Sequence, residues 1–179
     1  VPSNGLHNKM SKTLEKISQT LDNLTETVGM LVSLLLLAII TVVSTEMVLR
    51  FVFNKPTPWA HELSSWLQVA VVFLGGAYAF NKGQFVRIDI LRIRMRPKMK
   101  ALIDITVGSI LLGLFSGVLI WKGADLAWQS FQMSEISATG AWSGPVFIPK
   151  LFVPLGGLLL LIAWISHILK QIVILNQGD

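Results

Sequence analysis

The sequence predicts an all-α membrane protein with four transmembrane helices and an N-terminal amphipathic interfacial helix. Four long stretches carry no charge: Val28–Thr45, Leu63–Phe80, Ile105–Trp121 and Leu151–Ile165. A helix rises ~1.5 Å per residue and the hydrocarbon layer is ~30 Å thick, so ~20 residues span it. Hydrophobic residues make up 53% of the 179 residues and charged residues only 14%. Because backbone polar groups in lipid must bond within the chain, the four stretches are expected to be helices.

The spans and their connections use the whole chain, so a single membrane domain is predicted. With their polar flanks the spans are expected at about residues 28–53, 62–81, 101–122 and 148–170. Residues 1–9 differ in character from the rest of the chain, which suggests a tag remnant ahead of a natural start at Met10. The chain has no cysteine, which excludes disulfides and thiolate metal sites.

Residues 10–27 form the predicted amphipathic helix. Its apolar residues recur at heptad spacing on an otherwise polar segment: Met10, Leu14, Ile17, Leu21, Leu24 and Val28. Such a stripe is typical of a helix that lies in the membrane interface or against a partner helix. Two heptads are short for an independent coiled coil, so the interface is the favoured interpretation.

Positive charge is concentrated in one connection. The segment from Lys82 to Lys100 contains a single acid, Asp89. Its basic residues are Lys82, Arg87, Arg92, Arg94, Arg96, Lys98 and Lys100. The positive-inside rule places this connection, and therefore both termini, in the cytoplasm. These side chains are expected to set orientation and contact anionic lipid headgroups. Nucleic-acid binding is the disfavoured interpretation of the same cluster.

Polar and aromatic residues gather at the opposite ends of the spans. Glu46 and Arg50 are four apart with the acid first, which favours a local ion pair or a polar contact to another chain. Glu62 lies in the first turn of the second span, where a carboxylate suits the helix dipole. Trp59 and Trp142 are placed as interfacial aromatics. We expect Arg50, Trp59, Glu62 and Trp142 to contact a partner outside the membrane.

Small residues mark possible helix-packing faces. Gly75 and Gly76 lie in the second span, and Ser109, Gly113 and Gly117 recur at steps of four in the third. Small side chains at this spacing allow helix backbones to approach closely in lipid. The pattern predicts close packing against another helix, in this chain or in a partner.

The chain carries no recognisable catalytic, cofactor or metal motif. Its histidines are scattered at positions 7, 61 and 167, and it has no phosphate-binding glycine loop or nucleophile motif. No span carries a charge near its centre, as a proton relay or ion path would need. We therefore expect no cofactor and no enzyme activity, and we expect the chain to be a subunit of a larger assembly.

Four motifs succeed one another between Arg50 and Leu91. They are Arg50–Asn54 (RFVFN), Trp59–Leu63 (WAHEL), Phe73–Tyr78 (FLGGAY) and a segment containing Gly83, Val86, Ile88, Asp89 and Leu91. Their order resembles the small membrane subunit of tripartite ATP-independent periplasmic (TRAP) transporters, the DctQ type. Two positions depart from the family: His61 stands where an acid is frequent, and Phe85 where a histidine is frequent.

The resemblance implies an inner-membrane subunit that pairs with a large multi-span subunit and a periplasmic binding protein. It implies that the large, elevator-type subunit holds the substrate and sodium sites, and that an organic acid is imported. The small subunit would brace the large one and help to dock the binding protein. The alternatives are a self-contained homo-oligomeric channel or exporter, and a membrane enzyme acting on lipids. An enzyme should show His, Asp or Glu side chains converging at one membrane face.

Single cysteines on this cysteine-free background test the orientation. An impermeant thiol reagent added to intact cells is expected to label position 57 or 139, in the outer connections. Position 94 is expected to stay unlabelled, because the basic connection faces the cytoplasm. Labelling of position 94 in intact cells would contradict this topology.

Overall fold

The computed structural model describes residues 3–84, 99, 103–137 and 143–177. Its helices are α1 (Ser3–Phe51), α2 (Ala60–Asn81), the π-helical turn η1 (Asp104–Gly108), α5 (Ser109–Gln132) and α6 (Phe147–Gln177). Four of the helices are long and apolar enough to cross a membrane. The predicted all-α class with four membrane-crossing helices is confirmed.

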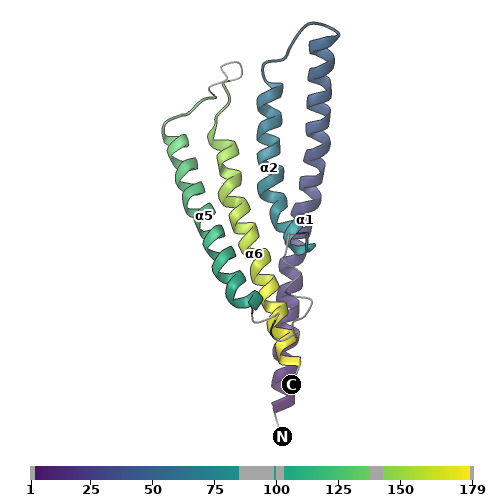
Figure 1. Cartoon of the computed structure of the whole chain (residues 1–179), viewed down its shortest axis with the longest axis vertical. Helices are drawn as coiled ribbons and strands as arrows, with labels where there is room; N and C mark the ends of the chain where they lie inside the picture. The colour runs from purple at the N-terminus through teal and green to yellow at the C-terminus, as the bar shows by residue number, and fades with distance from the viewer. Residues whose placement is uncertain (1–2, 85–98, 100–102, 138–142, 178–179) are drawn as a thin grey trace.

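The helices stand side by side in the order α5, α6, α2, α1, with both termini at the same end (Figure 1). α6 contacts each of the other three helices, and its most apolar stretch is the most buried of the four. α1 and α5 are the outer members and expose most of their apolar side chains. Exposed apolar surface of this extent is expected for helices that face lipid or other subunits.

α1 runs without a break through the segment predicted as a separate amphipathic helix. Its 49 residues correspond to a length of ~74 Å, far more than the ~30 Å hydrocarbon layer. The end of α1 that carries the N-terminus projects past the end of α2, together with the C-terminal end of α6 (Figure 1). An interfacial position for residues 10–27 stays a prediction.

The buried apolar cluster is small and joins α2 to α6. It consists of Ala77, Phe80, Leu160, Ala163 and Trp164. The Phe80 and Trp164 rings meet edge to face, with centroids 5.7 Å apart, an arrangement that adds to simple area burial. The cluster fixes the centre of the bundle around α6.

Glycines allow the closest helix contacts. A Cβ atom placed on Gly156 would lie 2.5 Å from the carbonyl oxygen of Phe73, so α6 passes directly against the α2 backbone. A Cβ on Gly29 would lie 2.4 Å from the Tyr78 ring, and one on Gly123 would lie 2.9 Å from the Pro154 ring. Each helix pair in the row is therefore closed at a position where no side chain fits.

The glycines expected to pack are in more open surroundings within this chain. A Cβ on Gly75 would make only an ordinary contact, 3.4 Å from Val32. Around Gly76, Gly113 and Gly117 nothing lies within 4 Å of the added atom. No close helix packing occurs at these three positions in the part of the chain that the structure describes.

The ends of α2 and α5 share one backbone motif. Gly83 comes after α2 with φ of +70°, and the amide of Gln84 donates to the Ala79 carbonyl at 3.0 Å. This is a Schellman motif, in which a left-handed residue lets the last carbonyls find donors. Ser134 plays the same part after α5, with φ of 47°.

The glycine contacts predict how a glycine-to-alanine substitution changes the thermal stability of the protein. Gly156→Ala should lower the thermal stability of the purified protein by several degrees, because overpacking a closed contact costs ~1–3 kcal/mol. Gly76→Ala, one helix away in open space, is the matched control and should change little. Equal melting temperatures for both variants would show that α2 and α6 are not closely packed at Gly156.

Candidate functional site

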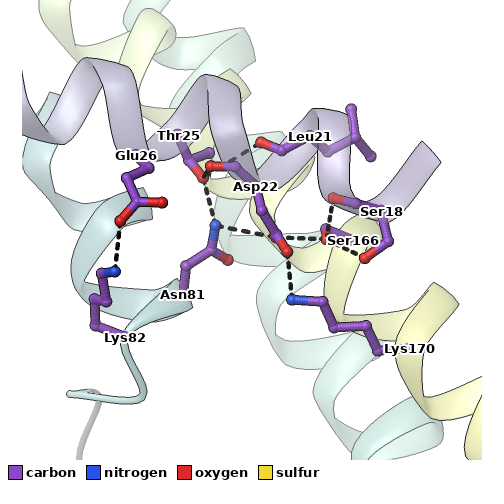
Figure 2. Close-up of polar contacts among 9 residues, drawn as sticks. All are labelled: Ser18, Leu21, Asp22, Thr25, Glu26, Asn81, Lys82, Ser166 and Lys170. Atoms are coloured by element: carbon purple, nitrogen blue, oxygen red, sulfur yellow. Dashed lines mark hydrogen bonds and ion pairs between the residues drawn. The ribbon is translucent and has the colours of Figure 1, made fainter. Parts of the chain in front are cut away.

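Polar residues of three helices meet at the end of the bundle where the termini lie (Figure 2). We call them the basal cluster: Ser18, Asp22 and Thr25 of α1, Asn81 of α2, and Ser166 and Lys170 of α6. The α1 members are spaced by four and three residues and therefore share one helix face. That face turns towards the bundle, although its composition suggests a water-facing side.

Asp22 is the centre of the basal cluster. One carboxylate oxygen pairs with the Lys170 ammonium at 2.5 Å. The other accepts a hydrogen bond from the Ser166 hydroxyl at 2.7 Å and one from the Asn81 amide at 3.4 Å. A single side chain of α1 thus contacts both α2 and α6, and charge-assisted bonds of this kind are stronger than neutral ones.

The hydroxyl groups of the basal cluster are buried and satisfied. Ser166 is 0% exposed and Ser18 is 2% exposed. Their hydroxyl oxygens lie 3.0 Å apart, and Ser166 also approaches the Ser18 carbonyl at 3.2 Å. Thr25 donates to the Asp22 carbonyl at 2.9 Å and accepts a bond from the Asn81 amide. A buried polar group without such partners would cost ~1–3 kcal/mol.

An ion pair lies beside this cluster at the end of α2. The Lys82 ammonium is 2.7 Å from a Glu26 oxygen, and both side chains are almost half exposed. It also lies 5.4 Å from the centre of the Tyr78 ring. The hydrogen bond from Lys82 to Glu26, and then the Glu26 charge, raise the pKa of Lys82. An exposed pair of this kind adds little stability, but it places charged groups level with the end of α2.

At the opposite end of the bundle, Glu46 joins α1 to the connection before α2. One carboxylate oxygen accepts bonds from Arg50 Nε at 3.2 Å and Nη2 at 2.8 Å, so the ion pair favoured by the spacing is present. The other oxygen accepts a bond from the Thr57 amide at 2.9 Å and one from its hydroxyl. Sequence reasoning missed Thr57, because its eleven-residue separation from Glu46 carries no periodic signal.

The connection between α5 and α6 is closed by its own contacts. Glu135 pairs with Lys150, and its carbonyl accepts a bond from the Val146 amide at 3.1 Å. The hydrogen bond from Lys150 is the main cause that lowers the pKa of Glu135. The carboxylate thus stays charged across the physiological range, and the connection is anchored where it leaves α5 and where it meets α6.

The four residues expected to contact a partner differ from one another in exposure. Arg50 and Trp59 are exposed, whereas Glu62 is 6% exposed and lies inside the chain. Trp142 lies outside the described residues. So do Arg87, Arg92, Arg94, Arg96, Lys98 and Lys100, the basic residues expected to set orientation.

These clusters are suited to holding helices together. In the part of the chain that the structure describes, no three His, Cys, Asp or Glu side chains are grouped to hold a metal ion. The basal cluster lies level with the end of α2, and each of the ion pairs joins two elements or two turns of a helix. A shallow apolar groove on α5 is lined by Gly113, Leu114, Gly117, Val118, Trp121 and Lys122.

A comparison with known protein families gives a match. The model of the family described as "Tripartite ATP-independent periplasmic transporters, DctQ component" matches residues 39–173. This range contains α2, α5 and the whole span-forming part of α6, but only the last turns of α1. No curated protein matches the chain.

Asp22→Ala tests whether the basal cluster holds α1. Amide hydrogens in residues 13–27 should exchange with solvent about tenfold faster, because lost charge-assisted bonds ease local opening by ~1–2 kcal/mol. Hydrogen exchange with mass spectrometry measures this. Asn23→Ala, the exposed neighbour, should leave exchange unchanged. If both variants exchange like the unmodified protein, the cluster does not hold the helix.

Proposed function

Since the chain belongs to the DctQ family of TRAP transporter components, we propose that it is the scaffold subunit that braces the large membrane subunit during import. Members of this family work with a large membrane subunit and a periplasmic binding protein in a tripartite complex. The family and the four apolar helices make this chain a multi-pass protein of the inner membrane. The proposal concerns what the chain contributes to that complex.

The observation that carries the proposal is the absence of charge from the interior of the spans. Between Leu63 and Phe80, and between Ile105 and Trp121, there is no Asp, Glu, Lys or Arg. The same holds from Val28 to Thr45 and from Leu151 to Ile165. An anion that crosses ~30 Å of hydrocarbon needs fixed positive or hydrogen-bonding groups along its route. A path through the spans of this chain would offer an anion no charged side chain.

The contacts between helices support a static role. At Gly29, Gly123 and Gly156 even a single added Cβ atom would clash with the neighbouring helix. The basal cluster and the Glu46–Thr57 contact then tie α1 to its neighbours at both ends. Close-packed interfaces resist gradual deformation, so such a bundle suits a support against which another subunit moves.

The finer parts of the proposal concern cargo, coupling and contacts. We propose that the large subunit carries an organic acid, coupled to sodium, and that the binding protein delivers it. Both termini of this chain are proposed to face the cytoplasm. Arg50, Trp59 and Trp142 are proposed to contact partners on the outer side. Glu62, which is buried in this chain, is left out of this proposed contact surface.

Reconstitution into proteoliposomes tests the role. The large subunit and the binding protein should import substrate poorly without this chain, and import should recover at least tenfold when it is added. This chain alone should give no concentrative uptake, because its spans hold no charged group along a route. Full transport without it, or uptake by it alone, would contradict the scaffold role.

A further inference from the structure

An exposed apolar stripe runs along α1 at seven-residue steps. Ile17 and Leu24 are each 45% exposed, and Leu31 is 60% exposed. The residue after each of them is buried in this chain's own bundle; these are Ser18, Thr25 and Val32. Because consecutive helix residues point ~100° apart, burial of the second set turns the first set outward. The basal cluster therefore sets the rotation at which α1 presents the stripe.

The lower part of the stripe lies past the level at which α2 ends. The Glu26–Lys82 pair stands at the end of α2, where charged groups reach water. Ile17 precedes Glu26 by nine residues, or ~14 Å along the helix axis. α1 is one continuous helix through this point, so its lower part continues the line of the part that crosses the membrane. Lipid can cover Leu31, but Ile17 needs another cover.

The spacing of the stripe indicates what that cover is. From Met10 to Val28 apolar side chains occur only at the two core positions of a seven-residue repeat, which is typical of a seam between two helices. From Met30 onward apolar side chains are exposed without this restriction, as contact with lipid allows. A second line at the same spacing, half-buried, runs beside the stripe: Leu14, Leu21, Val28, Leu35, Val42 and Leu49. The two lines form a seam that continues from the projecting end of α1 into the membrane. The occupant is therefore a helix that runs both inside and beyond the membrane.

We infer that this seam docks a helix of the large membrane subunit. The inference rests on the proposed function, in which the large subunit is the membrane-spanning partner of this chain. The groove on α5 that contains Gly113 and Gly117 differs, because its exposed side chains, such as Trp121, lie within a span. Lipid is sufficient cover there. The projecting stripe on α1 is the surface where a protein partner is needed.

Paired glutamate variants in the complete complex test the seam. Leu24→Glu should lower the amount of large subunit recovered with this chain by about tenfold or more, because burying one leucine side chain corresponds to one to two powers of ten in affinity. Asn23→Glu adds the same charge at the exposed neighbouring position, off the seam, and should leave recovery unchanged. Equal recovery with both variants would overturn the inference.

A photoreactive amino acid at position 24 identifies the occupant directly. The expected product is a covalent adduct with the large subunit, and position 23 should give little of it. An adduct with a second copy of this chain, adducts with lipid alone, or no adduct would each overturn the seam. If the large subunit still co-purifies in those cases, only this inference fails. If the unmodified chain recovers no large subunit at all, the proposed function fails with it.

Discussion

An unpaired charge in the hydrocarbon layer costs several kcal/mol, and the rest of this structure depends on that constraint. Among the described residues, the ion pairs of Asp22 and Glu26 lie towards one end of the bundle, and those of Glu46 and Glu135 lie at the other. Between the two ends the helices are held together by close packing. Glycines allow it, because they have no side chain that would keep neighbouring helices apart. A bundle joined in this way has fixed ends and a close-packed, uncharged middle.

The central position of α6 links these features to function. It contacts α5, α2 and α1, and it supplies Ser166 and Lys170 to the basal cluster and Gly156 to the closest approach. The outer helices, α1 and α5, are left with open apolar faces. A component built around one inner helix, with free faces on both sides, has the form expected of a subunit that enlarges a partner's scaffold.

The fold class could be predicted from the sequence because hydropathy over ~20 residues is a strong, local signal. The resemblance to the DctQ family rests on motifs between Arg50 and Leu91, around the α1–α2 connection, in α2 and just after it, which are also local. The basal cluster was missed because Ser18, Asp22 and Thr25 have the composition of a water-facing side, and their burial depends on the position of α6. The close-packing glycines were missed because a glycine's neighbour depends on helix rotation. Gly113 and Gly117 fit a spacing rule but are open in this chain, whereas Gly29 and Gly156 do not stand out by spacing.

The central claim is that this chain stays rigid while another subunit moves. Spin labels on cysteines introduced at the exposed positions Lys55 and Gln129 would report the distance between its two halves in the complete complex. The chain has no cysteine of its own, so the labels are specific. Pulsed electron–electron double resonance should give the same distance distribution at rest and during transport. A change of ~5 Å, the rise of one helical turn, would contradict a static scaffold.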